Sequence, residues 1–143
     1  MIDIRSYEVE SDEYLQELSL RDLVLRQPLG LKLSDIDTLG DSEQIHYGAF
    51  DRDLLVGCVQ LKLDPKNNAQ ITQMAVRSSH RKLGIGRSLV RQAESRCWAE
   101  KYNLIRLNAR AYAMGFYEKL GYKICSEKFM LVGIPHFQME KSR

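Results

Sequence analysis

The chain has 143 residues, of which 44% are hydrophobic and 28% are charged. This balance is typical of a folded globular protein, and the length predicts one domain, residues 1–143, rather than two. A formal net charge of +2, without a run of basic residues, argues against a nucleic-acid or membrane partner.

The spacing of cysteines and histidines argues against a disulfide framework and a metal site. The cysteines are odd in number and far apart: Cys58, Cys97 and Cys125. The histidines are equally isolated: His46, His80 and His136. We therefore expect reduced cysteines and no metal. The N-terminus lacks the apolar segment of a signal peptide, and no apolar run approaches the ~20 residues that span a bilayer, so we expect a cytoplasmic protein.

The first half of the chain predicts one helix and four strands. Residues 2–9 form the first expected strand. Ser11 is a suitable N-cap for a helix that runs to Leu25 and is ended by Pro28 and Gly30. Residues 31–43 are polar and turn-like. Polar turns at residues 51–53 and 64–68 then separate three further expected strands: 46–50, 54–63 and 69–76.

In the second half, the hydrophobic period changes at Gly84. Apolar residues recur every four positions and predict a helix that ends near residues 101–103: Ile85, Leu89, Ala93 and Cys97. A strand at 104–109, a short helix at 111–120 ended by Gly121, and strands at 122–125 and 129–139 follow. Pro135 predicts an edge or a bulge in the last strand. This order predicts an α/β or α+β fold, with helices on the faces of a mixed sheet.

A strand, a tight loop and a helix that begins with two glycines meet around residues 70–88. The first N–H groups of a helix have no internal partner and carry partial positive charge, and glycine lets a ligand approach the backbone closely. Three nearby cations strengthen the prediction of a pyrophosphate site: Arg81, Lys82 and Arg87. The pair Gly84 and Gly86 alone is also compatible with a plain turn. The segment is neither a P-loop nor the full dinucleotide motif, whose third glycine is replaced by Leu89.

Two segments carry a resemblance to a known family. Arg81-Lys82-Leu83-Gly84-Ile85-Gly86 resembles the Gln/Arg-x-x-Gly-x-Gly/Ala motif with which GNAT acetyltransferases hold the pyrophosphate of acetyl-CoA. About 30 residues later, Phe116-Tyr117-Glu118-Lys119-Leu120-Gly121-Tyr122 is similar to the second signature of that family. The resemblance covers about residues 54–139. The segments 46–50 and 133–136 are similar to the small bacterial ElaA-like branch.

The resemblance implies the GNAT fold, a mixed and mostly antiparallel sheet of six or seven strands with about four flanking helices. It implies acetyl transfer from acetyl-CoA to a primary amine, of a small molecule or a peptide, by direct attack in a ternary complex. It makes Tyr117 the catalytic acid that protonates the departing CoA thiolate. It also assigns cofactor binding to Met74, Ala75, Val76, Arg81, Lys82, Leu83, Gly84, Ile85, Gly86, Arg87, Ser88 and Asn108.

The sequence departs from the family pattern at two places. Ala111, beside Arg110, stands where many relatives have the asparagine of a CoA contact. The strand at 69–76 lacks the acidic residue that serves many relatives as general base, so either strand histidine, His46 or His136, is a candidate for that role.

Several alternatives stay open. Tyr117 is also compatible with a purely structural role at the edge of a helix. The acidic loop is either solvated or an acidic rim that attracts a cationic amine: Asp35, Asp37, Asp41 and Glu43. The chain as a whole could be a catalytically inactive CoA-binding regulatory domain or a nucleotide binder. A homodimer is a further expectation that the sequence leaves open.

Overall fold

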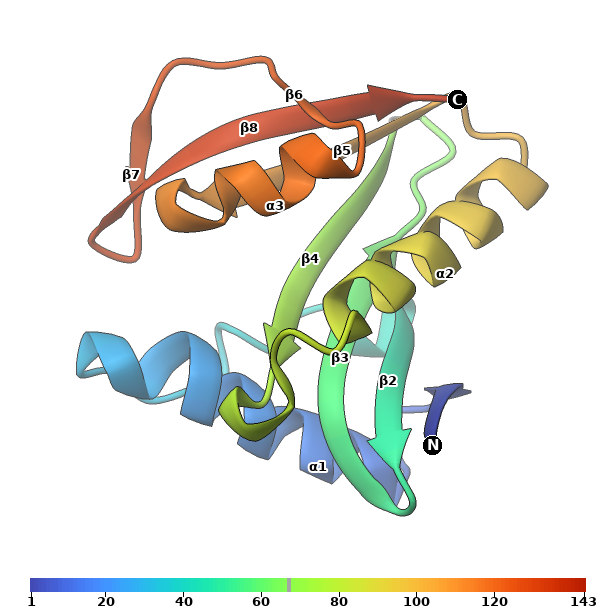
Figure 1. The fold of residues 1–143 in the computed structure, drawn as a ribbon, viewed down its shortest axis with the longest axis vertical. Coiled ribbons are helices and arrows are strands. Elements are labelled where there is room, and N and C mark those ends of the chain that lie inside the picture. The colour runs from blue at the N-terminus through green and yellow to red at the C-terminus, as the bar shows by residue number, and fades with distance from the viewer. Residues whose placement is uncertain (67) are drawn as a thin grey trace.

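The structure, a computed structural model, describes residues 1–66 and 68–143. Asn67, in the predicted turn at 64–68, lies outside the described residues. Three α-helices are described: α1 (Asp12–Arg21), α2 (Ile85–Ala99) and α3 (Met114–Lys119). The described strands form one sheet (Figure 1): β1 (Ile2–Tyr7), β2 (Ile45–Asp51), β3 (Leu54–Lys62), β4 (Ala69–Val76), β5 (Leu104–Arg110), β6 (Lys123–Ile124), β7 (Phe129–Leu131) and β8 (Ile134–Ser142).

The strands lie in the order β1-β2-β3-β4-β5-β8-β6, and β7 pairs with β8 on the side away from β5. Among the described strands only the β4–β5 pair is parallel. The predicted mixed, mostly antiparallel sheet is therefore confirmed. It has eight strands where six or seven were expected, and three α-helices where about four were expected.

The first helix begins as predicted and ends in an irregular segment. Ser11 accepts a hydrogen bond from the N–H of Tyr14 at 3.2 Å, which satisfies one of the free donors of the first turn. After α1 the chain continues through a π-helical turn, η1 (Asp22–Arg26), and a 3₁₀ turn, η2 (Gln27–Leu29). Gly30, at a φ of 73°, ends the helix as expected.

The expected single strand at 129–139 is wrong, because the structure contains a hairpin there. Val132 and Gly133 have φ values of 47° and 80° and join β7 to β8. Two consecutive positive φ values make the kind of turn whose twist matches that of the flanking strands. Pro135 lies opposite Met130 and precedes His136, the first residue of β8 that pairs with β5. It therefore occupies a locally open edge, as its missing N–H requires.

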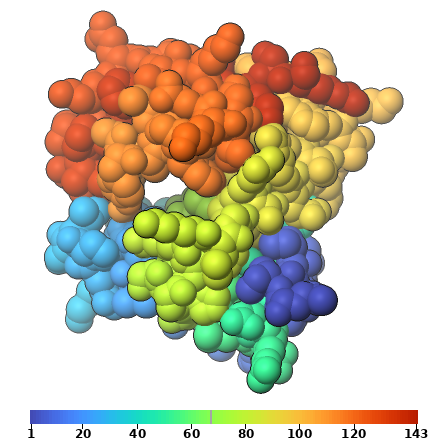
Figure 2. All heavy atoms as spheres, in the orientation of Figure 1, coloured from blue at the N-terminus to red at the C-terminus, as the bar shows by residue number. Residues whose placement is uncertain are grey.

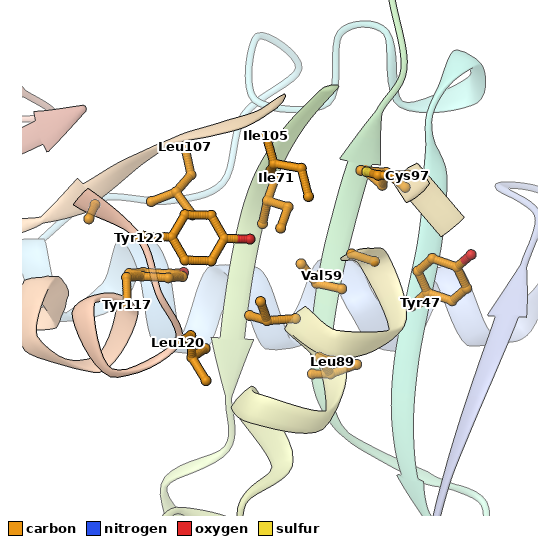
Figure 3. Packing of buried hydrophobic residues seen from close by; sticks show 14 of the residues in the cluster. Tyr47, Val59, Ile71, Leu89, Cys97, Ile105, Leu107, Tyr117, Leu120 and Tyr122 are labelled. Atoms are coloured by element: carbon orange, nitrogen blue, oxygen red, sulfur yellow. The ribbon is translucent and has the colours of Figure 1, made fainter. Parts of the chain in front are cut away.

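The helices cover opposite faces of the sheet. Apolar residues of α1 and η1 pack with Phe50, Leu55 and Ala75 on one face. Residues of α2 and α3 pack with Ile71, Ile105 and Leu107 on the other (Figure 3). The predicted four-residue period of α2 is confirmed, since Leu89, Ala93 and Cys97 are fully buried. No described helix combines the length and apolar character that crossing a membrane demands.

Candidate active site

A cavity opens where β4 and β5 diverge. The two strands pair only at their beginnings, through Ala69–Ile105, Gln70–Arg106 and Ile71–Leu107. Beyond these pairs they separate (Figure 1), and the gap holds a cavity of about 820 Å³. In the space-filling view it opens between the light blue segment around η1, the yellow-green loop before α2, and the orange-brown start of α3 (Figure 2). A volume of this size accommodates a cofactor-sized ligand.

A β-bulge in β4 decides which side chains face each side of this cavity. The β3–β4 register shifts between Cys58 and Gln60, and Gln73 has a φ of 54°. The inserted residue reverses the alternation along the strand. Before the bulge, Ile71 faces α2 and α3, whereas after it Ala75 faces α1. The backbone at the bulge is thereby left beside the cavity instead of paired with β5.

The start of α2 forms one wall of the cavity. Its first intrahelical hydrogen bond runs from the Ser88 N–H to the Gly84 carbonyl at 3.0 Å, and no side chain caps the helix. The preceding N–H groups are thus free of intrahelical partners. Lys82 and Gly84 have φ values of 65° and 77°, which turn the loop into the helix. The first turn carries no acidic residue, so its positive end faces the cavity without a counter-charge.

Most of the predicted cofactor residues meet at this cavity. Ten of them line it: Met74, Ala75, Val76, Arg81, Lys82, Gly84, Ile85, Gly86, Arg87 and Asn108. Leu83 and Ser88 are exposed and lie outside the lining. A Cβ atom on Gly86 would lie 3.1 Å from Cζ of Phe116, so the absent side chain lets α2 and α3 approach each other at the cavity. The cofactor-binding role of these residues stays a prediction.

Tyr117 lines the same cavity from α3. Its ring centroid lies 4.9 Å from that of Phe116. It lies 5.9 Å from the ring centroid of Tyr122, which is next to it in Figure 3. The side chain is buried, and none of the described residues hydrogen bonds to its hydroxyl. Burial raises the pKa of Tyr117 well above its usual value of 10.0. The hydroxyl is therefore protonated at neutral pH and free to donate to a ligand.

The three histidines have different surroundings. His80 lines the cavity, but its Nε2 lies 2.9 Å from Asp51 Oδ2, and this hydrogen bond lowers the pKa of Asp51. His136 also lines the cavity and is buried. Its Nδ1 lies 3.0 Å from the Ile134 carbonyl, which accepts only, so Nδ1 carries a proton, and in the neutral imidazole Nε2 is then the acceptor. His46 lies outside the cavity lining, in a separate group of buried charges.

This group, the buried polar cluster, consists of Glu17, Arg21, Asp41 and His46. Arg21 Nη1 lies 2.9 Å from Glu17 and 2.7 Å from Asp41, and His46 Nδ1 lies 2.9 Å from Glu17. Burial opposes protonation of His46, but the hydrogen bonds and charges of Glu17 and Asp41 together outweigh it and raise the pKa of His46. Gln60 connects the cluster to the cavity, because it donates to Asp41 and accepts from Thr72, both at 2.7 Å.

The expected acidic rim is therefore only partly available. Asp41 is buried in the cluster, and Asp37 pairs with Arg26 at 2.9 Å, which lowers the pKa of Asp37. Both carboxylates hold the acidic loop against α1 and η1, Asp41 by accepting from Arg21 and Asp37 by accepting from Arg26. Asp35 and Glu43 are exposed. Neither an aspartate nor a glutamate is among the described residues that line the cavity.

Several lining residues were not anticipated from the sequence. They come from η1 and from the β7–β8 turn: Val24, Leu25, Arg26, Leu131 and Val132. Nothing in their own sequence pattern indicates a site, since they reach it only through the tertiary fold. Within the described part of the chain, no group of three or more histidine, cysteine, aspartate or glutamate side chains is arranged to hold a metal ion.

The chain is similar in sequence to known proteins. A family model described as an acetyltransferase (GNAT) domain matches residues 34–143. A proposed acetyltransferase of Bacillus subtilis (strain 168) is 33% identical over 115 residues, which cover 80% of this chain and 76% of that protein. The uncharacterized N-acetyltransferase YjcF of the same organism is 32% identical over 108 residues, covering 75% of this chain and 76% of its own.

Solved structures share the fold. The crystal structure of Escherichia coli ElaA matches with a TM-score of 0.84 at 22% identity, covering 99% of this chain and 100% of that one. An aminoglycoside 6'-N-acetyltransferase complexed with coenzyme A matches with a TM-score of 0.76 at 22% identity, covering 98% and 96%. The resemblance seen in the sequence is confirmed: the chain belongs to the GNAT acetyltransferase family.

Proposed function

We propose that this protein transfers the acetyl group of acetyl-CoA to a primary amine by direct attack in a ternary complex. The observation that carries the proposal is the convergence of three features on one cavity. These are the gap between β4 and β5, the uncapped start of α2 and the unpartnered hydroxyl of Tyr117. A long cofactor with a charged pyrophosphate at one end and a thioester at the other suits this arrangement.

In this proposal the pyrophosphate accepts hydrogen bonds from the free N–H groups at the start of α2, with Arg81, Lys82 and Arg87 supplying positive charge. The pantetheine arm lies along the bulged part of β4, whose backbone does not pair with β5. The thioester then lies near Tyr117, which lines the same cavity from α3.

The chemistry balances without a further reactant. The amine nitrogen attacks the thioester carbon, a C–N bond forms and the C–S bond breaks. Tyr117, which its raised pKa keeps protonated, donates its proton to the departing sulfur and then regains one from water. The proton lost by the amine passes to Nε2 of His136, which lines the cavity with Nδ1 already committed to a carbonyl. A backbone N–H beside the cavity stabilises the oxyanion of the tetrahedral intermediate.

The cofactor half of the proposal predicts the effect of filling the space at Gly86. In Gly86→Val the new side chain enters the gap between α2 and Phe116, where the pyrophosphate must approach. We expect the dissociation constant for acetyl-CoA to rise at least about tenfold, or about 1.4 kcal/mol. Gly115→Val is the matched control, because nothing lies within 4 Å of a Cβ atom there. Calorimetric titration of both folded variants measures the difference.

Unchanged acetyl-CoA affinity in a folded Gly86→Val protein would remove the pyrophosphate from this position. Turnover of a panel of primary amines, followed by release of the CoA thiol, tests the transfer itself. A protein that binds acetyl-CoA but acetylates no amine is an inactive CoA-binding domain, and this outcome contradicts the proposed function.

The proton-transfer step predicts a role for His136. His136→Asn keeps an N–H that can reach the Ile134 carbonyl but removes the basic nitrogen. We expect kcat/KM to fall by about 10- to 1,000-fold, with the lower value if water accepts the proton instead. His80→Asn, at the other cavity histidine, should keep kcat/KM because His80 is bound to Asp51. Equal kcat/KM for the parent and His136→Asn would assign the base elsewhere.

A further inference from the structure

The two faces of the sheet divide the cavity into a cofactor side and an acceptor side. On β5, Leu107 and Ala109 face α2 and α3. Because side chains alternate along a strand, Asn108 and Arg110 face the opposite side, which α1 and η1 cover. The hydrogen bond from Arg110 to Leu25 of η1 supports this orientation. Arg110 therefore lies across the sheet from the positive charges around the start of α2.

Among the described residues, only neutral groups hold Arg110 in place. Its Nη2 donates to the Leu25 carbonyl at 2.8 Å, and its Nη1 donates to the Tyr112 hydroxyl at 3.4 Å. A guanidinium has five N–H donors, so most of its donors stay available. In the β5–β8 register Arg110 lies directly opposite His136, and directly opposite residues project from the same face of a sheet. Both line the cavity.

The charged residues that line the cavity are unbalanced. No carboxylate is among the described lining residues. Six of them are lysines or arginines: Arg26, Arg81, Lys82, Arg87, Arg110 and Lys119. The phosphates of a CoA molecule would take up the charges at the start of α2. Arg26 on the acceptor side is neutralised by Asp37, at 2.9 Å and 3.3 Å. Among the lining residues that the structure describes on the acceptor side, Arg110 is left without a counter-charge.

We propose that the acceptor is a small amine that carries a carboxylate, of the amino-acid class, and that Arg110 binds this carboxylate. The inference rests on the proposed acetyl transfer and names its substrate class. A planar guanidinium binds a carboxylate through two parallel hydrogen bonds. Such binding fixes the amine near His136, which projects beside Arg110 from the neighbouring strand. The positive charge of Arg110 also favours the neutral, nucleophilic form of a nearby amine.

The same charges argue against polycationic acceptors. A polyamine or an aminoglycoside would bring several positive charges into a cavity with no carboxylate among its described lining residues. Like charges at close range are unfavourable unless they are paired. Asp41 and Asp37 of the acidic loop are already engaged with Arg21 and Arg26. The fold shared with an aminoglycoside acetyltransferase thus does not extend to its substrate class.

The test compares matched acceptors in matched variants. The acceptors are the twenty common amino acids, their carboxamides, spermidine and kanamycin, each assayed at saturating acetyl-CoA. The variants are Arg110→Gln, Arg110→Lys and the control Arg106→Gln. Arg106 lies on the same face of β5, pairs with Glu140 and does not line the cavity. The amino group of a carboxamide is less basic than that of its amino acid. This difference cancels when the ratio of kcat/KM for the acid to kcat/KM for the amide is compared between the parent and a variant.

We expect an amino acid to be the best acceptor of the parent. Arg110→Gln should lower kcat/KM for the amino acid by about 10- to 100-fold, as for charge-assisted hydrogen bonds. Its carboxamide should change by less than about threefold, because it makes no charged pair with Arg110. Arg110→Lys should retain part of the preference for the amino acid over its carboxamide, and Arg106→Gln should retain all of it. The affinity for acetyl-CoA should stay the same in every variant.

If Arg110→Gln lowers kcat/KM equally for the amino acid and its carboxamide, Arg110 only supports the fold and the inference is overturned. So would spermidine or kanamycin as the best acceptor, although acetyl transfer would then stand. A loss of acetyl-CoA affinity in Arg110→Gln would place the guanidinium on the cofactor instead. A protein that binds acetyl-CoA and acetylates none of these amines contradicts both the substrate class and the proposed function.

Discussion

Replacing Tyr117 with phenylalanine is expected to lower kcat by roughly ten- to a thousand-fold while leaving acetyl-CoA affinity unchanged. The substitution removes one oxygen and keeps the ring contacts with Phe116 and Tyr122. The hydroxyl has no hydrogen bond to the described residues, so little folding energy depends on it. Its proton is needed only as negative charge develops on the sulfur, and its effect therefore belongs to the transition state.

Tyr122→Phe provides the matched control. Tyr122 lies beside Tyr117, but its hydroxyl donates to Glu94 at 2.8 Å and it does not line the cavity. We expect this control to lose about 1–3 kcal/mol of stability and to keep kcat. Because burial raises the pKa of Tyr117 above its usual 10.0, the parent should show no alkaline loss of rate from this group below pH 10. Full kcat in a chemistry-limited assay of Tyr117→Phe would make the hydroxyl structural.

Replacing Arg21 with methionine is expected to lower the free energy of unfolding by about 3–5 kcal/mol. Arg21 is fully buried and bonds to both carboxylates of the buried polar cluster, Glu17 and Asp41, and to the carbonyl of Asp37. Removing its charge leaves these carboxylates without their shared cation, in a place that water does not reach. The loss is a large part of the 5–15 kcal/mol that typically separates a folded domain from its unfolded chain.

Arg96→Met is the control, because it removes an exposed arginine instead of a buried one. Arg96 pairs with Glu100 on the surface of α2, where both side chains are more than 40% exposed. An exposed pair contributes about 0–1 kcal/mol, so this control should unfold nearly like the parent in chemical denaturation. Similar losses in Arg21→Met and Arg96→Met would show that the buried polar cluster does not hold α1 and the acidic loop to the sheet.

The sequence predicted those elements whose local pattern agrees with the final fold. The four-residue apolar period and the glycines at the start of α2 identified both the helix and the loop that opens on the cavity. It missed the β7–β8 hairpin, because Val132 is not a usual residue for a turn with positive φ.

The sequence indicated the residues that line the cavity at the start of α2 and largely missed those that line it from η1. Glycine and arginine spacing within a few residues is a local pattern, and it predicts a phosphate loop. By contrast, the bond from Arg110 to Leu25 joins residues 85 positions apart, and no local pattern indicates it. The burial of Asp41 was also not predictable from a local pattern. Its partner Arg21 lies 20 positions earlier in α1, and only the tertiary fold brings the two side chains together.

A crystal structure with acetyl-CoA tests the central claim most directly. We predict the pyrophosphate at the free N–H groups of residues 85–87, the pantetheine arm between the diverging strands β4 and β5, and the thioester sulfur within hydrogen-bond reach of the Tyr117 hydroxyl. Acetyl-CoA bound outside this gap, or bound in it with the thioester turned away from Tyr117, would contradict the account.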